Sequence, residues 1–296
     1  MPARHEDHTE AEFEIVEPAQ VLAPVVFNSP HSGARYRPEF LASARLDPLA
    51  LRRSEDAFVD ELFLHAVAFG APLMRAHFPR AYLDVNREPY ELDPRMFEGR
   101  LPPYANTRSL RVAGGLGTIA RVVGDAQEIY RGRLPVEEAI GRIENIYKPY
   151  HEALGTLVSD ICHIFGSAIL IDCHSMPSTG LGRDERQRVD VVLGDRYGSS
   201  CNPFLSDFAE VTLRGLGFSV ARNRPYAGGY ITEHYGAPAM GVHALQIEIN
   251  RALYMDEKTH ERTAGFAVLC GKLGAFCEHL ILFAQRELVV RRAAAE

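Results

Sequence analysis

Apolar and polar positions along the chain form two alternating kinds of segment. Short runs rich in β-branched residues have the length and composition of buried strands, and they lie at 24–28, 81–85, 168–173, 189–193, 218–221 and 244–249. Longer segments with apolar residues at helical spacing lie at 55–69, 136–166, 203–216 and 257–288. This alternation predicts an α/β fold, a three-layer αβα sandwich in which helices cover both faces of a central, mostly parallel or mixed sheet.

One long segment departs from this pattern. Residues 86–133 are rich in Pro, Gly and Arg, and a connection of that length inside a compact domain is usually functional. Its glycines, in AGGLGT at 113–118, match neither the GxGxxG nor the GxxxxGK[ST] phosphate-binding motif. We expect one α/β domain over 1–296, with 86–133 as an active-site loop insertion and with 1–12 and 290–296 as frayed ends.

Composition narrows the classes of function. The 296 residues are 46% hydrophobic and 24% charged, which is ordinary for a globular protein. The net charge of −7 disfavours a nucleic-acid partner and leaves a small-molecule substrate as the better interpretation. A membrane is not expected as a partner, because no run approaches the roughly 20 apolar residues of a span and the polar start is unlike a secretory signal. We therefore expect a cytoplasmic protein whose five cysteines, without a CxxC pair, are reduced.

Reactive side chains gather where three of the predicted strands end. The three stretches are VVFNSPHSG at 25–33, AILIDCHS at 168–175 and ALQIEINR at 244–251. Ligands of open α/β sheets bind outside the carboxyl ends of strands, so we expect these ends to converge. His31 and His174 together with one acid would make a catalytic zinc site with an open position for water. Glu55 and Asp56 are candidate acids, although both also suit the start of a helix capped by Ser54.

Glu248 is a carboxylate inside an apolar strand. Burial would raise its pKa, so a purely structural role would require a partner such as Arg251. A functional role fits better, because a glutamate beside a metal-bound water can take its proton and pass it to a leaving amine. Arg87 follows another predicted strand, and the arginine fork binds planar carboxylates with two hydrogen bonds.

A metal-free hydrolase that uses Cys173 or Ser29 is an alternative. Side chains alternate along a strand, so Asp172 and His174 share one face and Cys173 points to the other. This alternation and the lack of a GxSxG motif disfavour a Cys–His dyad or a serine nucleophile.

Over residues 24–257 the chain resembles the N-formylglutamate amidohydrolase family, whose members are also called N-formylglutamate deformylases. The resemblance is carried by NSPHSGARY at 28–36, SEDAFVDELF at 54–63, YLDVNREPYELDP at 82–94, GLGTIARV at 115–122, IYKPYHEAL at 146–154, IDCHSMPS at 171–178, DVVLGDRYG at 190–198, and the stretch from GGYITEHYG to LQIEINRALYM at 228–255. So many blocks in the same order are not typical of chance similarity.

The resemblance implies a zinc-carboxypeptidase-like (phosphorylase/hydrolase-like) fold, related to carboxypeptidases and aspartoacylases. It also implies the hydrolysis of N-formyl-L-glutamate to formate and L-glutamate, a step of histidine degradation, with one divalent metal expected to be Zn²⁺. The His-x-x-Glu pair of those relatives is absent, because Ser32, Gly33 and Ala34 follow His31. The implied site residues are the metal ligands His31, Asp56 and His174, with Glu55 as the alternate to Asp56; the catalytic base Glu248; and Asn86, Arg87 and Arg251 for the substrate.

Two other functions stay open at this point. The first is a related zinc amidohydrolase or peptidase that acts on another small, anionic N-acyl amino acid. The second is a non-catalytic binding protein with the same fold, which the presence of both histidines and Glu248 disfavours. The residue types also admit cobalt, manganese or iron in place of zinc, and no feature of the sequence predicts an oligomeric state.

Overall fold

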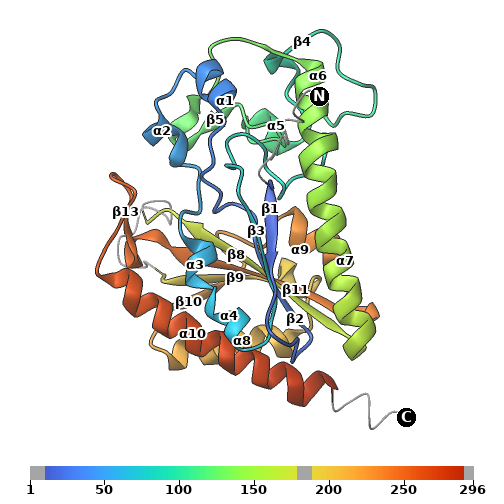
Figure 1. Ribbon diagram of the computed structural model, residues 1–296, viewed down its shortest axis with the longest axis vertical. Helices are drawn as coiled ribbons and strands as arrows, with labels where there is room; N and C mark the ends of the chain where they lie inside the picture. The colour runs from blue at the N-terminus through green and yellow to red at the C-terminus, as the bar shows by residue number, and fades with distance from the viewer. Residues whose placement is uncertain (1–10, 179–188, 290–296) are drawn as a thin grey trace, which may run out of the picture.

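A seven-stranded mixed sheet forms the centre of the computed structural model, which describes residues 11–178 and 189–289 (Figure 1). The strands are β1 (Phe13–Val16), β2 (Val25–Ser29), β3 (Leu73–Ala76), β8 (Ala168–Met176), β9 (Val191–Gly194), β10 (Val220–Arg222) and β11 (Val242–Asn250). Their order in the sheet is β1-β3-β2-β8-β11-β9-β10. Neighbours from β3 to β11 pair in parallel, β1 is antiparallel to β3, and β9 is antiparallel to β11. The carboxyl ends of β2, β8 and β11 therefore lie at one edge of the sheet.

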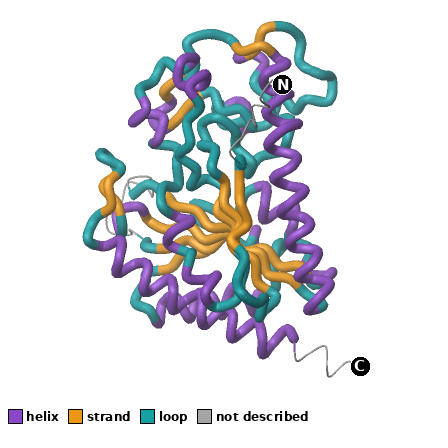
Figure 2. Tube along the Cα trace, viewed as in Figure 1, coloured by secondary structure: helices purple, strands orange, loops and turns teal. Residues whose placement is uncertain are grey.

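Helices cover both faces of this sheet, which confirms the predicted sandwich (Figures 1 and 2). One face carries α3 (Val59–Leu62), α4 (His65–Ala68), α8 (Pro203–Gly215) and α10 (Gly265–Ala284). The other face carries α7 (Lys148–Phe165) and α9 (Tyr230–Tyr235), and α7 continues α6 (Val136–Arg142) through a π-helical turn at Ile143–Tyr147. Each face has its own buried apolar cluster, since alternate residues of the strands point to opposite sides.

Smaller elements lie beyond the end of the sheet at which the parallel strands finish (Figure 2). They include the helices α1 (Pro38–Ser43), α2 (Pro48–Arg52) and α5 (Leu110–Ala113), and the two-residue strands β4 (Phe97–Glu98), β5 (Val122–Val123), β6 (Gln127–Glu128) and β7 (Leu134–Pro135). A further hairpin, β12 (Met255–Asp256) with β13 (Glu261–Arg262), precedes α10. The segment that we expected to be an active-site loop is thus folded and held by short elements.

Three predicted elements are wrong. Residues 81–85 form turns instead of a strand, because their apolar side chains are buried while Asp84 N bonds to Thr118 O and not to a strand. The predicted helix at 55–69 begins only at α3, after Phe58 with a left-handed φ of 66°, so Ser54 does not cap it. The predicted helix at 257–288 begins only at α10, after the β12–β13 hairpin. Of the predicted frayed ends, 1–10 and 290–296 lie outside the described residues.

One helix contradicts the expectation that no segment is long and apolar enough to span a membrane. Gly265–Glu287, which is α10 with the π-helical turn that follows it, has a mean hydropathy of 1.6 over an 18-residue window. Its side chains Leu273, Phe276 and Leu280 are fully buried against the sheet and its neighbouring helices. Burial in the core accounts for this apolar face, whereas Val268 and Leu282 are 63% and 41% exposed.

Candidate active site

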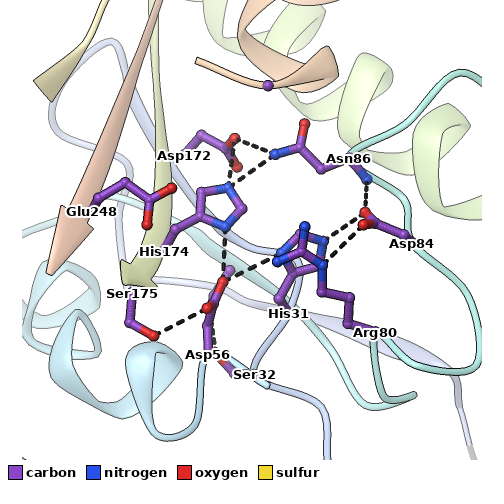
Figure 3. A network of polar contacts seen from close by, with 12 residues as sticks. His31, Ser32, Asp56, Arg80, Asp84, Asn86, Asp172, His174, Ser175 and Glu248 are labelled. Carbon is purple, nitrogen blue, oxygen red and sulfur yellow. Dashed lines mark hydrogen bonds and ion pairs between the residues drawn. The ribbon is translucent and has the colours of Figure 1, made fainter. Parts of the chain in front are cut away.

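Three strand ends and one loop bring the candidate chemistry together. His31 follows the end of β2, and His174 lies near the end of β8. Glu248 on β11 is directly opposite His174 in the parallel register, so both side chains lie on the same face of the sheet. Asp56 joins them because its backbone N–H donates to His31 O over 3.0 Å. Figure 3 shows these four side chains turned toward one another.

His31, Asp56 and His174 form a compact cluster of possible metal-binding groups. One ligand atom from each lies within 4.8 Å of the others, and all three residues are buried. Asp56 Oδ2 is 2.9 Å from His174 Nδ1 and 3.3 Å from His31 Nδ1. Within the described part of the chain His31 Nδ1 has no hydrogen-bond partner. A buried imidazole nitrogen that makes no hydrogen bond and lies 3.3 Å from a carboxylate oxygen, beside a second imidazole, fits a metal site with three protein ligands.

The outer nitrogen of each imidazole is held by another carboxylate. His31 Nε2 lies 2.8 Å from Asp84 Oδ1, and His174 Nε2 lies 2.9 Å from Asp172 Oδ2. In both rings Nδ1 is therefore the atom that faces Asp56 (Figure 3). Carboxylates in this outer position orient metal-binding histidines and make them better ligands.

The same contacts shift the protonation of the cluster. Burial alone would raise the pKa of Asp56, but hydrogen bonds and charges from His174 and His31 hold it well below its ordinary value. Burial opposes a charged His174, yet Asp172 and Asp56 raise its pKa well above the ordinary value. A cation that bound to these residues would have to displace a proton from His174.

Glu248 stands in a different electrostatic setting. It is 7% exposed, and its Oε1 accepts a hydrogen bond of 2.8 Å from Gln246 Nε2. Burial raises the pKa of Glu248 to about 8, which the charge of Asp56 reinforces against the nearby cations. A carboxylate with a pKa in this range can both accept and release a proton near neutral pH.

Asn86 is held on two sides, so that its amide faces the histidine cluster. Its Oδ1 accepts from Ile231 N over 2.8 Å, and its Nδ2 lies 3.4 Å from Asp172 Oδ2. Gly229 packs directly on this amide, and a Cβ at Gly229 would lie only 2.4 Å from its atoms. Glycine is required there because any larger residue would displace the Asn86 side chain.

The backbone on either side of Asn86 is anchored by α7 and the turn before it. Tyr147 Oη donates to Arg87 O over 2.6 Å, and His151 Nε2 lies 2.8 Å from Val85 O. Burial lowers the pKa of His151 to about 4, so the neutral ring donates to Val85 O through Nε2–H. Tyr147 and His151, which lie outside the cavity, thus hold the backbone of Asn86 in place.

A cavity of about 620 Å³ opens over the cluster. His31, His174 and Glu248 line it, together with parts of the segment 86–133 and the turn 225–229. Arginines are prominent among the described residues of its lining, which include Arg53, Arg80, Arg87, Arg111 and Arg251. Such a lining attracts a small anion.

The two arginines that we predicted for the substrate already contact the protein. Arg87 Nε and Nη1 donate to Leu116 O and Asn86 O over 2.8 and 2.7 Å. Arg251 donates to Asp56 Oδ1, Ser175 Oγ and Arg53 O over 3.1, 3.0 and 3.1 Å. The geometry thus places Arg251 behind Asp56, while Arg87 lies at the cavity wall.

The alternate acid Glu55 points away from the histidines. It accepts from Tyr36 Oη over 2.6 Å and pairs with Arg52 at 3.1 Å. Ser54 Oγ donates to Leu51 O instead of capping a helix. Asp56 is the acid of this loop that the fold brings to His31 and His174.

Cys173 and Ser29 are not part of this cluster. Cys173 packs in the apolar core on the opposite face of the sheet, as the strand alternation predicts. Ser29 Oγ is buried and bonds to Ser32 Oγ over 2.5 Å. Neither side chain lines the cavity in the described part of the chain.

Several polar residues of the site were given no role by the sequence reasoning, among them Arg80, Asp84, Asp172, Gln246 and Arg111. Two of them carried a signal, because Asp172 shares a strand face with His174 and Gln246 shares one with Glu248. Arg80 and Asp84 come from turns and irregular backbone, and Arg111 comes from the one-turn helix α5; in such short segments no periodic pattern marks a side chain that points inward.

Comparisons with known proteins show which family the chain is similar to. The family model for N-formylglutamate amidohydrolase matches residues 23–255. The crystal structure of N-formylglutamate amidohydrolase from Ralstonia eutropha is 38% identical, with a TM-score of 0.89 over 94% of this chain and 99% of that one. The N-formylglutamate deformylases of Pseudomonas aeruginosa and Pseudomonas putida are each 29% identical over 79% of this chain, and 83% and 82% of their own lengths are covered.

Proposed function

Because the chain belongs to the N-formylglutamate amidohydrolase family, we propose that it hydrolyses N-formyl-L-glutamate to formate and L-glutamate with the help of a divalent metal. That it is a hydrolase acting on an amide C–N bond follows from the family and its relatives. We infer the substrate and the metal from one observation, the cluster His31–Asp56–His174 beside Glu248 in a cavity rich in arginine. The proposal includes a cytoplasmic enzyme of histidine degradation, built as one domain with 86–133 as its active-site insertion.

His31, Asp56 and His174 would hold the metal through two imidazole Nδ1 atoms and one carboxylate oxygen. Zinc is the first candidate for this donor set, and cobalt, manganese and iron are compatible with it. When bound, such an ion lowers the pKa of water toward about 7 and polarises a carbonyl oxygen. Arg251 and Ser175 both bond to Asp56 Oδ1, which leaves Oδ2 turned to the histidines.

Glu248 is the proposed general base and then the general acid. One of its carboxylate oxygens takes a proton from the attacking water as the water oxygen bonds to the formyl carbon. The proton is then delivered to the amide nitrogen as the C–N bond breaks, so that formate and L-glutamate leave. Burial raises the pKa of Glu248 to about 8 in the metal-free protein, and the positive charge of a bound metal would lower it toward the range in which the carboxylate takes a proton near neutral pH.

Arginines of the cavity wall would orient the substrate. Arg87 keeps Nη2 3.5 Å from Asp84 Oδ2, an ion pair loose enough to admit a substrate carboxylate beside it. Arg80 donates to Asp84 through Nε over 2.9 Å and lines the cavity near Glu248, where its charge can stabilise negative charge on the formyl oxygen. Asn86 is held beside them by Ile231 and Asp172. Fixed donors of this kind align the reacting atoms.

The direct test is formate release from N-formyl-L-glutamate by purified protein, before and after chelation and after zinc add-back. We expect activity that the chelator abolishes and zinc restores. A parallel panel of N-acetyl and other N-acyl amino acids measures the preference for the formyl group and for glutamate. Chelator-insensitive release would remove the metal from the proposal, and release only from another N-acyl substrate would replace N-formyl-L-glutamate.

A further inference from the structure

Arg111 is an arginine of the cavity wall that the proposed mechanism does not use. It lies on the short helix α5 and lines the same cavity as His174 and Glu248. Its side chain is 33% exposed, and its contact among the described residues is an ion pair with Glu91 Oε2 at 3.7 Å. A pair at that distance leaves the donors of the guanidinium available to a ligand.

The other arginines that line the cavity donate hydrogen bonds to the protein. Arg80 donates to Asp84, and Arg53 donates to Gln127. Arg87 and Arg251 donate to backbone carbonyls and to the side chains of the site. Of the cavity-lining arginines in the described ranges, Arg111 is the one that donates no hydrogen bond to the protein.

The backbone that carries Arg111 is nevertheless fixed. Ser109 caps α5 by accepting from Val112 N over 3.1 Å, and Leu116 N bonds back to Arg111 O over 2.8 Å. Leu116 O in turn accepts from Arg87 Nε over 2.8 Å. A side chain with unused donors on a fixed backbone is the arrangement expected of a preorganised binding group.

Arg111 is linked to the histidine cluster through Arg87, and it therefore lies farther from that cluster along the chain of contacts. The chain of contacts runs from His31 to Asp84, from Asp84 to Arg87, and from Arg87 to Leu116 at the end of the Arg111 turn. Burial lowers the pKa of Arg87 to about 10, and the nearby charges of Arg80 and Arg111 contribute to this shift. Two neighbouring cations in one wall are stabilised when anionic groups lie between or beside them.

We propose that Arg111 binds the side-chain carboxylate of an acidic N-acyl amino acid and thereby makes the enzyme selective for such substrates. The inference rests on the proposed function and adds the residue that separates glutamate from its neutral analogues. Arg87 takes the carboxylate next to the scissile amide, and Arg111 takes the distal one. A guanidinium discriminates strongly between a carboxylate and an amide, because the amide gives up the charge and one acceptor.

The test compares kcat/KM for N-formyl-L-glutamate and its neutral isostere N-formyl-L-glutamine. In Arg111→Gln we expect a roughly 10- to 100-fold loss with the glutamate substrate, mainly through KM, and a change within about twofold with the glutamine substrate. Arg111→Lys should restore part of the loss. Arg108→Gln is the matched control, since it removes the same charge from an exposed position of the same segment that does not line the cavity.

Each contrary outcome has its own meaning. Equal losses with both substrates, or no loss with either, would overturn the role of Arg111 while wild-type activity upholds the proposed function. Metal-loaded wild-type protein that hydrolyses neither compound would overturn the proposed function and this inference with it. Thermal unfolding of Arg111→Gln and Arg111→Lys shows whether a loss reflects folding, and an Arg111→Lys variant that folds and shows no preference between the substrates also contradicts the proposal.

Discussion

The floor of the cavity and its outer wall are built in opposite ways. The floor, defined as His31, Asp56, His174 and Glu248, stands at the ends of central strands and in the loop packed on them, and none of its residues is more than 7% exposed. The outer wall, defined as residues 110–124, consists of the short helix α5, a turn and the short strand β5. It is partly exposed, since Leu110 is 92% and Leu116 45% exposed whereas Val112, Thr118 and Ile119 are buried. The rigid sheet holds the groups that need exact placement for chemistry, whereas the turns carry groups that meet the variable part of a substrate.

The floor buries several charged groups, and each of them requires a partner to offset the free energy of desolvation. Asp56, Asp84 and Asp172 surround two histidines in a buried volume, and each carboxylate is balanced by a specific donor. Removing one partner leaves another buried group unpaired, so changes in the floor are expected to be severe. The exposed and partly exposed side chains of the wall, such as Leu110 and Arg111, can change with less effect on folding, because they have fewer protein contacts than its buried residues.

The largest expected effect is on turnover in Glu248→Gln. Glutamine keeps the size of the side chain and a hydrogen bond with Gln246, but it cannot take a proton. We expect kcat to fall by at least about 10³-fold with the metal content unchanged. Formate release and metal analysis of the same preparation measure both quantities. Retained turnover would show that another residue acts as the general base.

Asp56→Asn should act on metal affinity. The substitution removes the negative charge between His31 and His174 while it preserves the shape of the side chain. We expect the affinity for Zn²⁺ to fall by about 10- to 100-fold or more, as measured by competition with a chromogenic chelator. Asp60→Asn is a matched control, because Asp60 pairs with Arg75 outside the cluster. Equal affinities of Asp56→Asn and wild type would exclude Asp56 as a ligand.

The buried Glu248 should also make the stability of metal-free protein depend on pH. Its pKa is raised from 4.5 to about 8 on folding, so its contribution to stability is lost as the pH rises from about 4.5 through 8. Glu248→Gln does not titrate, and it should therefore be more stable than wild type at pH 8.5 by on the order of a few kcal/mol. The advantage should shrink at pH 5. Chemical unfolding of both proteins at the two pH values measures it, and a difference independent of pH would contradict the raised pKa.

The floor could be predicted from the sequence to a greater extent than the wall. Apolar strands that end in His31 and His174, and Glu248 inside an apolar strand, are local patterns that mark a site from the order of residues alone. The metal-ligand and base roles of these residues stay predictions. The family resemblance favoured Asp56 over Glu55, and a tertiary contact that the residue order does not show, the bond from Asp56 N to His31 O, brings Asp56 to the histidines.

The wall and the turns at 80–85 beside it could not be predicted because nothing local distinguishes their residues. The run 81–85 has the apolar content of a strand, but burial of its side chains under turns satisfies the same pattern. Arg80, which precedes this run, and Asp84, which lies within it, were given no role for that reason. Arg111 is one of many arginines in the segment, and only the fold shows that it lines the cavity.

The smallest expected effect on turnover is in Cys173→Ala, one residue from His174. The thiol points into the core on the other face of β8, and burial raises its pKa well above the ordinary value. We expect unchanged kcat/KM and a loss of about 1–2 kcal/mol in unfolding free energy from the lost packing. Cys162→Ala, a half-buried cysteine of α7, is the matched control for stability. Inactive Cys173→Ala that is folded and metal-loaded would contradict this separation of the two faces of β8. The catalytic role would then have to include the Cys173 thiol in place of Glu248 and the metal ligands.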